Sequence, residues 1–406
     1  MALTVGIFLA TYVAMALGRL PGFRVDRTGA ALLGAIGMLV SEAIATDAAW
    51  ASISFPTMAL LFGLMIVSGS FSASGFYDWV ATRAAPLRLA PSALLAVMIA
   101  TSGVLSAILT NDVVVVAMVP LLVQLCQARG LNPVPFLLGF AFAANAGSAG
   151  TIIGSPQNMI IAEALHLSFL GFMKGAMVPA LLSLPLIWMV MVVLYRGRWV
   201  APAVATQAPA PVPLDKGETI KAAIVTVLVV AAFCLTSWPR PLVALGAAAI
   251  LLLNRRIASS NVLKHVDGDL FILLGGLFVV NAAFATTGLP QEAMNYLLQW
   301  GVDLMHPLTL LVTVGVLSDI VGNNPAVLLI VPYVKSANPE LAGEAMALGT
   351  GLASNVVVFG SLAGIIVVEE AGKRGVVISL GEFSRAGVPV SLIGLAIAAG
   401  WLAILG

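Results

Sequence analysis

Two short polar segments interrupt long apolar stretches of this sequence, and they match one another. The first, TND at 110–112, lies within GVLSAILTNDVVVVAMVP at 103–120, and the second, GNNP at 322–325, lies within GVLSDIVGNNPAVLLIVP at 315–332. Their amide and carboxylate groups could bind an ion or hydrogen-bond a polar solute. In lipid such tips are tolerated only where they line a cavity or are buried in protein. Matching tips in two halves of one chain therefore predict a single site built from both.

A glycine-rich polar stretch follows each tip, NAGSAGTIIGSPQN at 145–158 and GTGLASNVVVFGS at 349–361. Glycine permits backbone conformations that a helix forbids, and proline starts a half-helix well, so each stretch predicts a broken membrane helix. Unwound carbonyl groups can hold a cation, and the N–H groups of a half-helix can hold an anion. A single small polar residue in a membrane helix more often serves packing. The clustering in both halves favours a binding site.

Three acidic residues are candidates for coupling transport to Na⁺ or H⁺. Asp112 belongs to the first tip, Asp319 lies one turn before the second tip, and Glu163 follows the first glycine-rich stretch. A carboxylate at mid-membrane costs about 2.5–3.5 kcal/mol, so it is expected to have a task. The alternative for each is a structural role as an acceptor for neighbouring N–H groups. Apart from Na⁺ or H⁺ as a coupling ion, no metal or cofactor is predicted.

The composition excludes most soluble classes of protein. The chain has 406 residues, of which 60% are hydrophobic and 9% charged, whereas a soluble domain carries about 25% charged residues. A net charge of +1 gives no case for a nucleic-acid partner. The chain has no phosphate-binding loop and no HExxH or Ser/His/Asp set, so the sequence predicts neither an enzyme nor a need for an ATPase partner.

The elements that position these residues are expected to be membrane helices, since about 20 apolar residues cross a bilayer. We predict an all-α polytopic membrane protein of two inverted repeats, each with five transmembrane helices and one re-entrant helical hairpin. The first repeat spans 1–200 with its hairpin at about 92–126, and the second spans 218–406 with its hairpin at about 307–337. An Ala/Pro-rich cytoplasmic linker at 201–217 joins them. The arms of the second hairpin are too short to cross, whereas those of the first also fit two full spans.

The distribution of basic residues predicts the orientation. With the 19–28 loop in the cytoplasm, every Lys and Arg lies on the inner side except Lys174, Arg240 and Lys335. This is a strong positive-inside bias. It places both termini outside, and the odd number of crossings in the first half inverts the second. The expected location is a bacterial inner (plasma) membrane.

Four stretches resemble the motifs of the ion transporter superfamily: LTNDVVVVAMVP, NAGSAGTIIGSPQN, GNNPAVLLIVP and GLASNVVVFGSLAG. The chain is similar to the citrate transporter-like and arsenite-pump permeases over nearly its whole length, and more distantly to the divalent anion/sodium symporters. The resemblance implies that tips and breaks bind substrate and coupling ions, that the hairpin-bearing part moves like an elevator, and that the protein forms a homodimer. The residues that it implicates are Thr110, Asn111, Asp112, Asn145, Ser148, Thr151, Ser155, Asn158, Asn323, Asn324, Pro325, Ser354, Asn355, Gly360 and Ser361.

Departures from the family patterns leave the substrate open. Dicarboxylate symporters carry Ser-Asn-Thr at both tips, so the tips here have fewer hydroxyls and one added carboxylate. Residues 357–359 replace the Thr-Pro of arsenite pumps. The expected function is secondary active transport of a small anion, either a citrate-like carboxylate or an inorganic oxyacid, coupled to Na⁺ or H⁺. The alternatives are an arsenite or antimonite efflux permease, a Na⁺/H⁺ antiporter and, from a different class, an ion channel.

Overall fold

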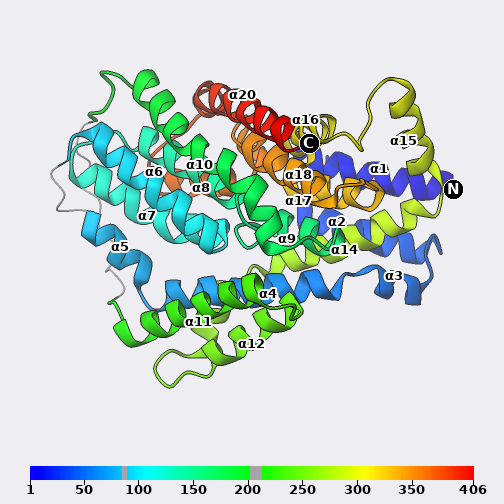
Figure 1. Cartoon of the computed structure of the whole chain (residues 1–406), viewed down its shortest axis with the longest axis horizontal. Helices are drawn as coiled ribbons and strands as arrows, with labels where there is room; N and C mark the ends of the chain where they lie inside the picture. The colour runs from blue at the N-terminus through cyan, green and yellow to red at the C-terminus, as the bar shows by residue number, and fades with distance from the viewer. Residues whose placement is uncertain (85–88, 202–212) are drawn as a thin grey trace.

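The protein is built from α-helices, as Figure 1 shows for its computed structural model. The structure describes residues 1–84, 89–201 and 213–406, and no strand occurs among them. The first half contains α1 (Ala2–Leu17), α2 (Arg27–Val40), α3 (Thr46–Ser52), α4 (Phe55–Ala73), α5 (Phe76–Ala84), α6 (Pro91–Ile108), α7 (Asn111–Ala128), α8 (Pro133–Ala149), α9 (Pro156–Ala164) and α10 (Phe169–Leu194).

The second half repeats this order. It contains α11 (Lys216–Leu235), α12 (Arg240–Leu252), α13 (Ser259–Leu263), α14 (Gly268–Ala285), α15 (Leu289–Gln299), α16 (Pro307–Val321), α17 (Asn323–Ile330), the 3₁₀ helix η1 (Val331–Tyr333), α18 (Pro339–Ala353), the 3₁₀ helix η2 (Val358–Gly360), α19 (Leu362–Gly372) and α20 (Leu380–Leu405). Of the linker predicted at 201–217, residues 202–212 lie outside the described residues.

Packing between the halves is reciprocal. Helix α4 packs on α12, and its counterpart α14 packs on α2. Within each half, α6 packs on α8 and α16 packs on α18. The closing helices α10 and α20, of 26 residues each, pack on one another. Each half thus packs its long helix α4 or α14 on the second helix of the other half.

Local sequence explains where these helices begin. The Ser54 hydroxyl accepts a hydrogen bond from the backbone N–H of Thr57 and caps α4, and the Asp267 carboxylate accepts one from the N–H of Leu270 and caps α14. Asn132 caps α8 and Asn338 caps α18 in the same way. Such caps satisfy N–H groups that have no partner within the helix. Almost every residue of α8 and α18 is buried, which places these two helices at the centre of the bundle.

Seven helices of the described part are long and apolar enough to cross a membrane: α4, α6, α7, α10, α11, α14 and α20. Both arms of the first hairpin, α6 and α7, are among them, so its re-entrant character stays a prediction. The second hairpin differs, because α17 has only 8 residues. At 1.5 Å per residue it is about 12 Å long, too short to cross.

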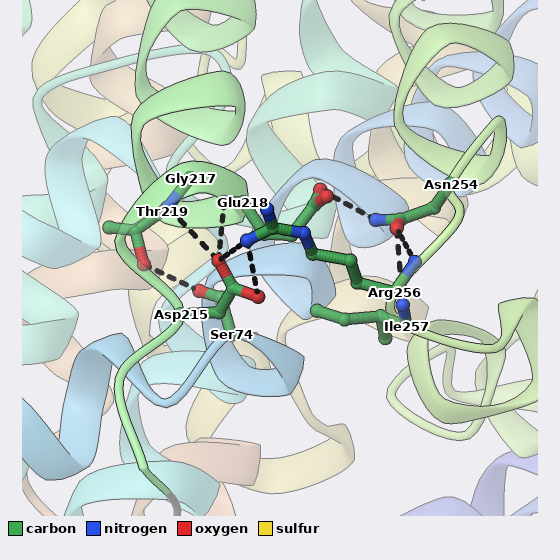
Figure 2. A network of polar contacts seen from close by, with 8 residues as sticks. All are labelled: Ser74, Asp215, Gly217, Glu218, Thr219, Asn254, Arg256 and Ile257. Carbon is green, nitrogen blue, oxygen red and sulfur yellow. Dashed lines mark hydrogen bonds and ion pairs between the residues drawn. The ribbon is translucent and has the colours of Figure 1, made fainter.

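The start of the second half is tied to the first half by a polar network (Figure 2). The N–H of Asp215 donates to the carbonyl of Ser74, at the end of α4, over 2.9 Å. The Asp215 carboxylate accepts hydrogen bonds from the N–H groups of Gly217 and Glu218 and caps α11. The Arg256 guanidinium, from the loop after α12, contacts the same carboxylate at 3.4 Å. The network joins α4, α11 and the α12–α13 loop.

This network predicts a pH-dependent stability. The pKa of Asp215 lies below its usual value, mainly because the N–H of Glu218 donates a hydrogen bond to the carboxylate and also because Arg256 is close by. Its stabilisation is therefore present above the usual carboxyl pKa and is lost as the pH falls through the lowered folded-state pKa. We expect Asp215→Ala to lower the thermal unfolding midpoint at neutral pH, with the difference from wild type shrinking in acid. Glu292→Ala, at an exposed position on α15, is the control. A difference of the same size at all pH values would contradict the prediction.

Candidate transport site

The two tips line one cavity. It has a volume of about 410 Å³ and lies between the two hairpins, the two breaks, and the first turns of α2 and α14. The predicted site residues on its wall are Asn111, Asp112, Asn323, Asn324, Pro325, Gly360 and Ser361. Tips that are distant in sequence are thus brought to a common space, with Pro156 and Gln157 of the first break beside them.

Each tip is hydrogen-bonded to the break of its own half. At the first tip, the N–H of Asn111 donates to the carbonyl of Gly154 over 2.9 Å. At the second, the hydroxyl of Ser354 donates to the side-chain oxygen of Asn323 over 3.0 Å. Helix α8 ends at Ala149 and α9 begins at Pro156, so the first break is an irregular segment that the tip can reach. Tip and break in each half form one polar unit.

The two breaks are bonded to one another through Asn145. Its side-chain amide donates to the side-chain oxygen of Asn355 over 2.9 Å and to the hydroxyl of Ser361 over 3.0 Å. All three residues are nearly inaccessible to solvent. These bonds cross from the first half of the chain to the second, so the breaks form a continuous polar layer.

The other predicted residues of the first break support its backbone. The Asn158 amide donates to the carbonyls of Ser148 and Thr151, at 2.9 and 2.8 Å. The Thr151 hydroxyl donates to the carbonyl of Ala107 in α6 over 2.6 Å. Ser155 is fully buried at the N-cap of α9. These side chains hold the irregular backbone in place behind the cavity wall.

Helices α4 and α1 are hydrogen-bonded to the two tips from outside the hairpins. The N–H of Thr110 donates to the hydroxyl of Ser68 in α4 over 2.9 Å. The Tyr12 hydroxyl of α1 lies 2.9 Å from the side-chain oxygen of Asn281 in α14 and 3.4 Å from the carbonyl of Pro325. Each tip is therefore hydrogen-bonded both to a break and to a helix outside its hairpin.

Buried polar atoms without a hydrogen-bond partner gather around the tips and breaks. An unsatisfied buried donor or acceptor costs about 1–3 kcal/mol, so such a concentration marks groups available to a solute or ion. Most are oxygen atoms, the ligand type that Na⁺ and hydrogen-bond donors share. They belong to Ser106, Thr110, Asn111, Ser155, Asn158, Asp319, Asn324 and Asn355.

Besides Asp112, charged residues that the sequence did not predict at the site line the cavity. Arg27, in the first turn of α2, is the one basic residue among its described lining residues. Its Nε donates to the carbonyl of Met15, and its terminal nitrogens lie 3.5 Å from the carbonyl of Phe359 in η2. The acidic lining residues are Asp26, Asp112, Asp267, Asp269 and Glu369. No local motif marks Arg27, which reaches the site only through the packing of α2 against the second break.

The three coupling candidates have different surroundings. Asp112 faces the cavity of about 410 Å³ that both tips line, which we call the central cavity. Asp319 lies beside Gly360, where an added Cβ would come within 2.6 Å of its Oδ1 atom, so it adjoins the second break. Glu163 lies elsewhere, because its carboxylate pairs with Arg240 at 3.1 Å and lines a separate cavity of about 590 Å³. The structure therefore groups Asp112 and Asp319 with the tips and leaves Glu163 apart.

Comparison with known proteins identifies the family. The sequence profile described as "Citrate transporter" matches residues 12–364. The chain belongs to the citrate transporter family. This family member is 29% identical to the uncharacterized transporter Rv2684 of Mycobacterium tuberculosis, over 98% of this chain and 97% of that protein. It is 26% identical to the silicon efflux transporter LSI3 of Oryza sativa subsp. japonica, over 86% of each.

A solved structure shows the same fold. The YdaH transporter of Alcanivorax borkumensis superimposes with a TM-score of 0.59 at 14% identity, covering 99% of this chain and 96% of the other. The profile match and the relatives confirm the resemblance to the ion transporter superfamily, and the shared fold confirms the expectation of an all-α polytopic membrane protein. This citrate transporter family member is an integral membrane transport protein and not an enzyme.

Proposed function

We propose that the protein is a secondary active transporter of a small anion, either a citrate-like carboxylate or an inorganic oxyacid, coupled to Na⁺ or H⁺. The observation that carries the proposal is the cavity lined by both tips, with Arg27 and five carboxylates on its wall. The inner membrane of a bacterium, with both termini outside, is the proposed location. A homodimer is the proposed assembly.

The charges around the cavity support coupling to a cation. A guanidinium recognises carboxylates and oxyanions through paired hydrogen bonds, which gives Arg27 a role toward an anionic group. The surrounding carboxylates repel a lone anion and attract cations. Binding of the anion is therefore favoured when a cation binds with it, which is the physical basis of symport. Asp112 and the unpartnered tip oxygens supply ligands for that cation.

Two further cavities support alternating access. One, of about 390 Å³, lies between the α13–α14 connection, the start of α7 and α19. The other, of about 590 Å³, lies between the α3–α4 connection, α17 and α9. Each is bounded by the counterparts of the helices that bound the other. With inverted repeats these cavities lie toward opposite membrane faces, and an elevator-like motion of hairpins and breaks would open the site to each in turn.

Uptake into proteoliposomes tests the proposal. Radiolabelled citrate and silicic acid would be offered under an inward Na⁺ gradient, an inward proton gradient or neither, with protein-free liposomes as the control. We expect saturable uptake of one probe that runs uphill only under an ion gradient. Flux that does not saturate and never runs uphill would indicate a channel, and absence of flux for both probes would refute the proposed substrate classes.

One relative favours the inorganic oxyacid over the carboxylate. The rice protein is named for silicon efflux, and silicon in water is carried by an inorganic oxyacid, silicic acid. Export is tested in the same liposomes loaded with silicic acid, with arsenite and antimonite loaded in parallel. Efflux of arsenite but not silicic acid would assign the metalloid alternative instead. Collapse of a pH gradient on adding Na⁺ alone would assign Na⁺/H⁺ antiport.

Arg27→Gln is expected to weaken binding of an anionic substrate by about tenfold to a hundredfold. A hydrogen bond to a charged group contributes about 1.5–3 kcal/mol, which corresponds to that range. The KM for uptake measures the effect. Arg27→Lys keeps the charge and should recover part of the affinity, whereas Arg24→Gln, at an exposed position, should leave KM unchanged. An unaltered KM in Arg27→Gln would exclude the guanidinium from anion binding.

A further inference from the structure

A buried acidic residue lies near the N-terminal end of α18, away from the central cavity. Glu344 belongs to the second turn of α18, and only 4% of its surface is exposed. It lies about 15 Å along the helix from Ser354, at 1.5 Å per residue. Glu344 is thus between the N-terminal end of α18 and the second break, and it does not line the central cavity.

The neighbouring helix α10 is shaped to admit this carboxylate. Gly175 of α10 lies directly against it, so that an added Cβ would overlap the carboxylate atoms. One turn earlier, Gly171 faces the carboxylate of Glu340 in the same way. The Ser168 hydroxyl, at the N-cap of α10, donates to Glu340 over 2.7 Å. Two glycines therefore make room for two acidic side chains on one face of α18. Of the two, only Glu340 accepts a hydrogen bond.

Glu344 has no hydrogen-bond or ion-pair partner among the described residues. The group that faces it from its own helix is Glu340, which has the same charge. On α10, Lys174 is next to Gly175, but its side chain is exposed. On α9, Glu163 is paired with Arg240, and His166 follows that helix. Helix α8 carries no titratable side chain, and the last turn of α20 contributes only the carboxyl group of Gly406. Helix α16, which also packs on α18, has His306 at its N-cap and Asp319 near its C-terminal end.

The first half offers no counterpart to this acid. When Gly154 is aligned with Gly360, Glu344 aligns with Leu138 of α8. Leu138 is fully buried, as a packing residue should be. A carboxylate in place of a leucine at this depth costs several kcal/mol when it is ionised and unpaired. A purely structural role would be met at lower cost by leucine, so the acid is expected to serve a chemical task.

We propose that Glu344 is a proton-binding site, with Glu340 and Ser168 forming the route between it and the membrane surface. The carboxyl group binds a proton when α10 closes over it and releases the proton when α18 moves relative to Gly175. The proposal rests on the proposed transport function and names H⁺ as a coupling ion. It places that ion on α18, outside the cavity in which the tips meet.

Infrared difference spectroscopy tests proton binding without any substrate. The purified full-length protein, reconstituted in liposomes, would be titrated with pH in Na⁺-free buffer while the carbonyl stretch of protonated carboxyl groups is recorded. We expect a pH-dependent carboxyl band that is lost in Glu344→Gln and retained in Glu369→Gln, whose acid lies on the central cavity. The same band in Glu344→Gln as in wild type would overturn the proposal.

Two further measurements keep the outcome interpretable. If Glu344→Gln does not fold, Gly175→Ala serves instead, because its added methyl group displaces the Glu344 carboxylate from the space beside Gly175. The carboxyl band should then shift, and an unshifted band would again overturn the proposal. Uptake of the probe that the wild type transports, measured against pH, should lose its pH dependence in Glu344→Gln. If the wild type transports neither probe but still shows the pH-dependent carboxyl band, the proposed function is refuted and the proton-binding site is not.

Discussion

Asn111→Ala and Asn323→Ala are each expected to lower transport by about tenfold to a hundredfold, an effect as large as that of Arg27→Gln. Each removes a side-chain amide from the cavity wall, and a hydrogen bond to a charged group contributes about 1.5–3 kcal/mol. The Asn111 side-chain oxygen has no partner in the protein. Its backbone N–H remains bonded to Gly154 in the variant. The loss should therefore appear in binding rather than in folding.

Asn323 differs because its oxygen accepts a hydrogen bond from Ser354. The Ser354 hydroxyl also contacts the carbonyl of Thr350, so the alanine variant does not leave that hydroxyl without a partner. Uptake in proteoliposomes measures both variants, with Asn295→Ala, at an exposed position of α15, as the control. Unchanged transport in both tip variants, at normal levels of membrane protein, would remove the tips from the site.

Gly147→Ala is expected to produce the largest loss of stability. An added Cβ would lie 2.6 Å from the Cα atom of Gly103 and would overlap its carbonyl oxygen. Both are backbone atoms, so no flexible side chain can move aside. Overpacking of this kind costs about 1–3 kcal/mol, and here it would separate α6 from α8 at the level of the first break. Thermal unfolding in mild detergent measures the effect.

Gly246→Ala is the matched control for that experiment. Gly246 lies inside α12, and nothing lies within 4 Å of an added Cβ. Because glycine disfavours a helix interior by about 0.5–1 kcal/mol relative to alanine, the control should be neutral or slightly stabilising. Equal unfolding midpoints for the two variants would show that the α6–α8 contact tolerates a side chain.

The tips and breaks could be predicted because each is a local pattern of polar and glycine residues inside apolar sequence. The repetition of these patterns in both halves is a second indication of a binding site. Helix α8 ends within the first predicted break. Arg27 carries no such pattern, since its role depends on where α2 meets Phe359. Glu344 was missed for the same reason, because the glycine notch that receives it belongs to another helix. Glu163 stays a predicted coupling residue, and its ion pair with Arg240 could not be predicted because the two residues are far apart in the sequence.

The Asn145 bridge constrains how any motion must proceed. Because one amide holds both Asn355 and Ser361, the two irregular segments cannot slide past one another without breaking buried bonds. We therefore expect the two breaks to move together as one rigid body. In the proposed elevator-like motion, the hydrogen bonds of the tips to Ser68 and Tyr12, which lie on helices outside the hairpins, would be broken and re-formed at each turnover. The turnover rate would accordingly depend on the contacts between the moving part and the helices around it, and not on bonds within the moving part.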